Sequence, residues 1–125
     1  MRLYLLIGLA GALGAMARFA LSGLMMHWLG RGFPWGTMAV NLIGSALMGF
    51  LAVWLAARWH LPLEYRIAVL TGFLGAFTTF SAFSIDALAL VERNQWLLAA
   101  LYVLGTVILC LAGARAGMLL AERLT

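Results

Sequence analysis

A ten-residue stretch, GAFTTFSAFS at residues 75–84, interleaves phenylalanine rings with hydroxyl groups inside an otherwise apolar segment. An aromatic ring has a positively polarised edge, and a Ser or Thr hydroxyl can donate a hydrogen bond. The pattern is therefore suited to weak binding of a small anion. The alternative is plain packing, in which rings fill a core and hydroxyls bond back to their own helix. If the backbone stays helical, three rings spaced three residues apart lie roughly along one face: Phe77, Phe80 and Phe83.

The same stretch has the features of an interrupted membrane helix. Gly75 is its first residue and Gly72 lies three residues earlier, and glycine tolerates irregular dihedral angles. Neighbouring Ser and Thr side chains can satisfy the backbone groups that an interruption frees. Broken membrane helices expose carbonyl oxygens that coordinate cations at mid-membrane. The sequence thus predicts a break near Thr79, at the centre of its apolar run.

The elements that must position these residues are membrane helices. The chain has 125 residues, of which 66% are hydrophobic and 10% charged, far outside the range of soluble domains. Four apolar runs, each long enough to cross a hydrocarbon core, occupy residues 3–26, 33–57, 67–91 and 96–121. We predict an all-α membrane protein: one domain over residues 1–125, with four transmembrane helices and both termini on the same side.

The charge pattern indicates membrane anchoring rather than nucleic-acid binding. The net charge is +4 and every basic residue is Arg, mostly at the ends of the apolar runs. The side of the termini carries Arg2, Arg58, Arg66 and Arg123, and the other side carries Arg31 and Arg93. Because this bias is small, the chain could insert in both orientations. Four helices cannot readily enclose a solvated pathway alone, so a channel built from this chain is expected to be an oligomer.

Three polar residues are expected in one half of the membrane, displaced away from the termini. From the helical rise, Arg18, Asn41 and Asp86 lie about 5, 6 and 10 Å from the middles of their runs. Ionisable groups at such depth are costly and are usually paired or functional. Two interpretations stay open here: an Arg18–Asp86 structural pair with Asn41 joining helices, or a water-filled vestibule that attracts an anion.

Three segments closely resemble the Fluc/CrcB family of small fluoride channels. GLAGALGAMARF (8–19) is similar to the family's Gly-rich first helix, and PWGTMAVNLIGSALMG (34–49) resembles its second-helix signature. TGFLGAFTTFSAFSID (71–86) resembles the long third-helix signature. In the fourth run, polar side chains recur every fourth residue where the family has a polar track: Tyr102, Thr106 and Cys110.

The resemblance implies an antiparallel, dual-topology homodimer with two pores. It implies that the paired rings Phe80 and Phe83 and the Asn41 side chain face the fluoride path. Backbone carbonyls of Gly75 and Thr78 would hold a structural sodium ion on the dimer axis. We assign the remainder of the pathway to Ser81, Tyr102, Thr106 and Arg18. Two residues depart from the family pattern: Ala82, where many relatives have a hydroxyl, and Cys110, where serine is common.

The resulting prediction is a fluoride-selective passive channel that exports fluoride across the bacterial inner membrane as a multi-pass protein. It is not expected to be an enzyme or to bind nucleic acid. The first alternative is a proton-coupled small multidrug transporter. Such a carrier needs a carboxylate in its chamber, and the first apolar run has Arg18 as its only charge. The second alternative is a non-transporting scaffold subunit, which explains the glycines but not the ring and hydroxyl pattern.

Overall fold

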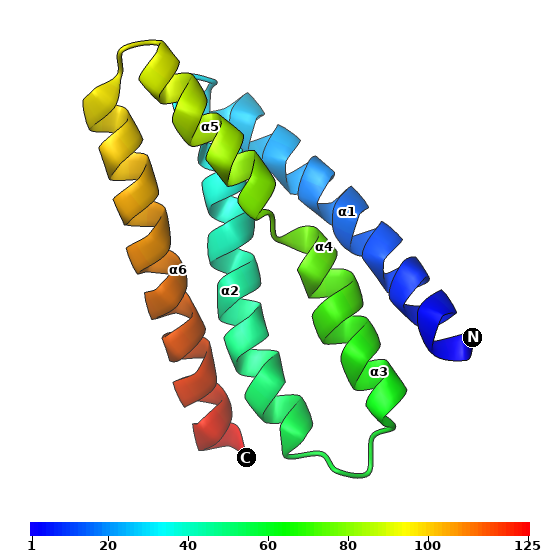
Figure 1. Cartoon of the computed structure of the whole chain (residues 1–125). Helices are drawn as coiled ribbons and strands as arrows, with labels where there is room; N and C mark the ends of the chain where they lie inside the picture. The colour runs from blue at the N-terminus through cyan, green and yellow to red at the C-terminus, as the bar shows by residue number, and fades with distance from the viewer.

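The computed structural model describes all 125 residues as a bundle of helices (Figure 1). The elements, in chain order, are α1 (Arg2–Leu29), α2 (Trp35–Ala56), α3 (Leu63–Ile67), η1 (Ala68–Leu74), α4 (Gly75–Phe77), α5 (Phe80–Glu92) and α6 (Trp96–Leu124). Four segments are long and apolar enough to cross a membrane: α1, α2, the composite Leu63–Glu92, and α6. The prediction of a four-helix multi-pass membrane protein is therefore confirmed.

Both chain ends lie toward the same end of the bundle, near the loop that joins α2 to α3 (Figure 1). The third membrane segment starts earlier than predicted, at Leu63 rather than near Ile67. Pro62 precedes it and Glu64 occupies its first turn, and both residues favour a helix N-terminus. The turns at the opposite end use left-handed residues, Gly30 (φ 82°) after α1 and Asn94 (φ 59°) before α6.

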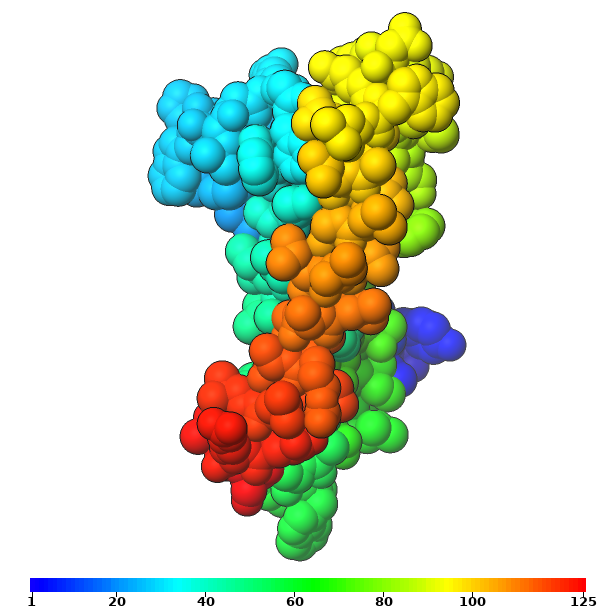
Figure 2. Space-filling view, turned by 90° about the vertical axis from the view of Figure 1, so that its left-hand side faces the viewer, coloured from blue at the N-terminus to red at the C-terminus, as the bar shows by residue number.

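Close helix packing depends on small residues. A Cβ atom built on Gly49 would lie 2.0 Å from the carbonyl oxygen of Ala114, and one on Gly117 would lie 2.2 Å from that of Ala46. Only glycine allows α2 and α6 to approach this closely, as is common between membrane helices. Figure 2 shows α6 crossing one face of the molecule with α2 beside it.

A single chain buries little of itself. Only 18 of the 125 residues are buried, which leaves most apolar side chains free to face lipid or another protein chain. The main buried cluster joins α5 to α6 and contains Phe83, Leu90, Ala99 and Tyr102. It therefore anchors the ring of Phe83 against the fourth membrane segment.

Candidate ion pathway

The backbone between α4 and α5 is extended. Thr78 has φ −82° and ψ 158°, and Thr79 has φ −152° and ψ 118°. The side chain of Asn41, from α2, bonds to both backbone polar groups of Thr79. Its Nδ2 donates to the Thr79 carbonyl oxygen at 2.9 Å, and its Oδ1 accepts from the Thr79 amide at 2.7 Å. One amide side chain thus takes the place of helical backbone bonds at this point.

The carbonyls of Gly75 and Thr78 are among those that lose their helical donors at this extended stretch. In a continuous α-helix the amides of Thr79 and Ala82 would donate to the carbonyls of Gly75 and Thr78. Here the Thr79 amide donates to Asn41, and the Ala82 amide donates to Thr79 Oγ1 at 3.2 Å. The Thr79 hydroxyl therefore caps the N-terminus of α5. The resemblance assigns these two carbonyls to sodium.

The interruption separates the three phenylalanines that would share a face of a continuous helix. Phe77 is buried and stacks on Phe73, with ring centroids 6.0 Å apart. Phe80 and Phe83 form a separate tilted pair, with centroids 5.5 Å apart. The backbone does not stay helical between Phe77 and Phe80, so the condition for three aligned rings is not met. The pair Phe80 and Phe83 remains together.

A cavity of about 250 Å³ brings together most of the predicted pathway. Its lining includes Asn41, Thr78, Phe80, Phe83, Thr106 and Cys110. Thr106 is only 5% exposed, and its Oγ1 has no hydrogen-bond partner. A buried hydroxyl without a partner is costly. The Thr106 hydroxyl therefore has an unused hydrogen-bond donor, on an oxygen that is itself buried in the wall of the cavity.

Tyr102 lies next to this cavity rather than in its lining. It is completely buried, and its ring packs on Phe83 with centroids 5.2 Å apart. Its hydroxyl donates to Asp86 Oδ2 at 3.3 Å, and Thr37 Oγ1 donates to the same oxygen at 2.6 Å. Tyr102 therefore positions Phe83 and joins α6 to α5 through Asp86.

The two remaining predicted residues, Arg18 and Ser81, line a different cavity. This cavity has a volume of about 620 Å³ and also contains Asp86 and Thr79. Arg18 and Asp86 form no ion pair, since the ion pairs of the chain are Arg2–Glu64 and Arg115–Glu122. The interpretation of Arg18 and Asp86 as a structural pair is therefore wrong. The Asp86 carboxylate takes hydroxyl donors instead.

Sequence reasoning missed Thr37, and it gave Gly44 only as one of the glycines that allow helices to pack closely. Thr37 lies four residues before Asn41, so both point from one face of α2 toward the interrupted helix, and this spacing was a usable signal. A Cβ atom on Gly44 would lie 2.2 Å from Thr78 Cγ2 and 3.1 Å from Phe77 Cδ1. Glycine is thus required where α2 passes the interruption.

The fold and the cavities define a class: a small membrane protein with four spanning segments and a cavity lined by rings and hydroxyl groups beside the extended backbone of Thr78 and Thr79. Residues 5–118 match the family described as "CrcB-like protein, Camphor Resistance (CrcB)". The chain belongs to this CrcB family, which confirms the resemblance of its three helix signatures.

Several curated relatives are named fluoride-specific ion channels. The protein of Methylococcus capsulatus, named FluC, is 56% identical over 118 residues, which cover 94% of this chain and 52% of that relative. The chain thus spans about half of the length of that relative. FluC of Magnetococcus marinus is 46% identical, covering 93% of this chain and 94% of the relative. FluC 2 of Nitrobacter hamburgensis is 44% identical, covering 98% of both chains. The family is one of ion channels, which confirms that the chain is not an enzyme.

Proposed function

We propose that this protein is a fluoride-selective passive channel. The observation that carries the proposal is the cavity lined by Phe80, Phe83 and Thr106, whose hydroxyl has no hydrogen-bond partner. The names of the curated relatives support the choice of fluoride. These groups are neutral, so they can replace the water around a small anion without trapping it.

Permeation requires that binding be favourable enough to admit fluoride and weak enough to release it. Ring edges, the Thr106 hydroxyl and the Ser81 hydroxyl would replace water in stages. Asn41 contributes through the backbone, because its amide is already bonded to Thr79. Arg18, in the neighbouring cavity, would attract the anion toward the interruption.

We propose that the channel is an antiparallel, dual-topology homodimer with two pores. The Phe80 ring is 78% exposed although it lines the cavity, so one wall is open at the surface of a single chain. A second copy would close that wall. The weak arginine bias between the two sides supports insertion in both orientations.

Labelling of single cysteines tests this orientation. Gly32→Cys and Thr125→Cys, each in a Cys110→Ser background, place a thiol at opposite ends of the bundle. We expect each site to react with an impermeant reagent from both sides of the membrane in about equal populations. Labelling of each site from one side alone contradicts dual topology.

We further propose that the third membrane helix is broken at mid-membrane and holds a structural sodium ion. The carbonyls of Gly75 and Thr78, from both protomers, would hold the ion, since both have lost their helical donors. Carbonyl oxygens are hard, neutral ligands that suit such a cation. The bound ion would supply positive charge that offsets the cost of holding anions in low dielectric.

The proposed cellular role is export of fluoride across the bacterial inner membrane. A membrane potential that is negative inside favours outward movement of an anion, by about 2.3 kcal/mol per charge for each 100 mV. Passive conduction is sufficient for export under that potential. No coupled ion is required.

Flux from liposomes separates this function from its two alternatives. Purified protein in liposomes is loaded in turn with fluoride, chloride and a cationic dye. A fluoride channel releases fluoride only, a proton-coupled multidrug transporter moves the dye with a proton gradient, and a scaffold subunit moves none of them. Release of the dye, or no release of fluoride, contradicts the proposal.

A further inference from the structure

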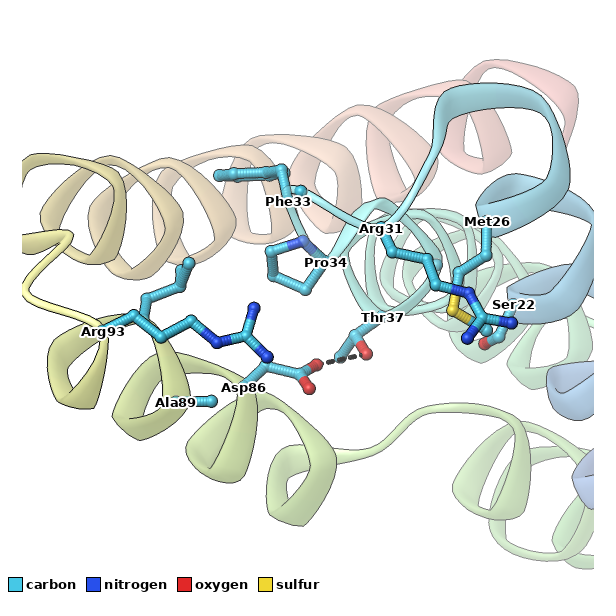
Figure 3. A pocket seen from close by; sticks show the side chains of 12 residues that line it. Ser22, Met26, Arg31, Phe33, Pro34, Thr37, Asp86, Ala89 and Arg93 are labelled. Atoms are coloured by element: carbon cyan, nitrogen blue, oxygen red, sulfur yellow. Dashed lines mark hydrogen bonds between the residues drawn. The ribbon is translucent and has the colours of Figure 1, made fainter.

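A third cavity, of about 300 Å³, opens at the end of the bundle opposite the chain termini (Figure 3). It lies between the C-terminal part of α1, the α1–α2 loop, the start of α2 and the C-terminal half of α5. Two arginines line it from different segments: Arg31 from the loop and Arg93 from the end of α5. Neither residue has a place in the pathway described above.

The two guanidinium groups are not neutralised by partners. The ion pairs of the chain are Arg2–Glu64 and Arg115–Glu122, both elsewhere. Figure 3 shows Arg93 on one side of the cavity and Arg31 on the other, with Asp86 and Thr37 between them. Asp86 is the single carboxylate in the lining, so two positive charges and one negative charge leave a net charge of +1.

This cavity adjoins the one that Arg18 lines. Ser22, Thr37 and Asp86 line both cavities. The linings of the two cavities together form a route of polar side chains from the surface, past the bonded Thr37 and Asp86, to Arg18 and Thr79. Adding Arg18 raises the net charge along this route to +2, since three arginines face one aspartate.

We propose that Arg31 and Arg93 form an anion-collecting site at the mouth of the channel. Its ligands are hydrated monovalent anions, which gather there before the selective segment removes their water. The site acts through charge at a distance and does not discriminate fluoride from chloride. Its effect on flux rests on the proposed function, whereas its effect on local anion concentration does not.

The expected size follows from Coulomb's law. In a hydrated cavity, a unit charge about 8 Å away changes the local concentration of a monovalent anion about twofold at low ionic strength. Two such charges give about a fivefold effect. Salt at about 0.5 M should abolish most of it, because the screening length then falls to a few ångströms.

Fluoride flux gives the first readout. We compare the double variant Arg31→Gln/Arg93→Gln with Arg58→Gln/Arg123→Gln, which removes the same charge near the termini, outside the cavity. At about 0.02 M ionic strength the mouth variant should conduct about three- to fivefold more slowly than the control. At about 0.5 M salt the two should converge. Equal flux at low salt, or a deficit that persists at high salt, overturns the proposal.

A second readout does not depend on conduction. Ala89 lines the same cavity. In an Ala89→Cys/Cys110→Ser background, the rates of reaction with anionic and cationic methanethiosulfonates report the local potential. Neutralising Arg31 and Arg93 should lower the anionic-to-cationic rate ratio about tenfold or more at low ionic strength, and the termini-side control should leave it unchanged. If the rate ratio of the mouth variant equals that of the wild type, the proposal of an anion-collecting site is overturned. If the wild-type protein conducts no fluoride, only the proposed function is refuted.

Discussion

Replacing Asn41 by alanine removes the side chain that joins α2 to the extended backbone between α4 and α5. Two hydrogen bonds are lost, at 2.9 and 2.7 Å. The Thr79 residue that they serve is only 9% exposed, so water cannot readily replace them. Asn41→Ala should therefore weaken the local structure on which the cavity depends.

The magnitude follows from the number of bonds. A buried hydrogen bond contributes about 1 kcal/mol net in soluble proteins. Double-mutant cycles in a membrane protein average about 0.6 kcal/mol per interhelical bond. Two bonds give about 1 to 2 kcal/mol, which is a change of about 5- to 30-fold in the folding equilibrium.

Denaturant titration of the purified protein in detergent measures this loss. The matched control is Ser45→Ala, one turn further along α2, which alters the same cavity without removing a hydrogen bond of the structure. We expect Asn41→Ala to unfold at lower denaturant than the control and to reduce fluoride flux. If the two variants differ by less than about 0.5 kcal/mol, the Asn41 bridge is not a structural requirement, and our reasoning fails.

Three further predictions test other parts of the account. Phe80→Ile and Phe83→Ile keep the bulk of the side chain but remove the polarised ring edge. Each should slow fluoride flux strongly, while size-exclusion chromatography shows an intact dimer. Near wild-type flux in both variants refutes a role for the rings. Gly44→Ala places a methyl group 2.2 Å from Thr78 Cγ2 and should lower the free energy of unfolding by about 1 to 3 kcal/mol, measured by thermal unfolding. The control Gly8→Ala has no atom within 4 Å of its new Cβ and should lower it much less. Equal losses of stability in the two variants would contradict the close approach of α2 at Gly44. Cys110→Ser adds a hydroxyl one turn after Thr106 in the same cavity and should raise fluoride flux, and a decrease would argue against a polar track along α6.

Hydropathy alone was enough to predict the four membrane segments and the common side of the termini. Span length is set by the thickness of the hydrocarbon core, which acts on each segment independently. Local signals did not predict the π-helix η1. A Cβ on Gly72 would lie 2.9 Å from the carbonyl oxygen of Ile7, so the geometry there is tied to close packing against α1. Such packing depends on the position of α1 relative to the third membrane segment, which no local sequence pattern specifies.

The candidate site was predicted as a set of residues but not as a set of contacts. The spacing of GAFTTFSAFS suggested an interruption, yet the partner of Thr79 could not be known before α2 was placed beside it. The same holds for Asp86, whose closest partners proved to be Thr37 and Tyr102 rather than Arg18. Opposite charges at similar depth predict a pair only when their helix faces meet.

The most direct test of the central claim is the reversal potential of the current carried by the purified protein in a planar bilayer. Fluoride and chloride are placed in opposed tenfold gradients, so that their equilibrium potentials differ in sign and each is about 59 mV in size. The account predicts reversal at the equilibrium potential of fluoride. Reversal near that of chloride, near zero, or no current at all would contradict it.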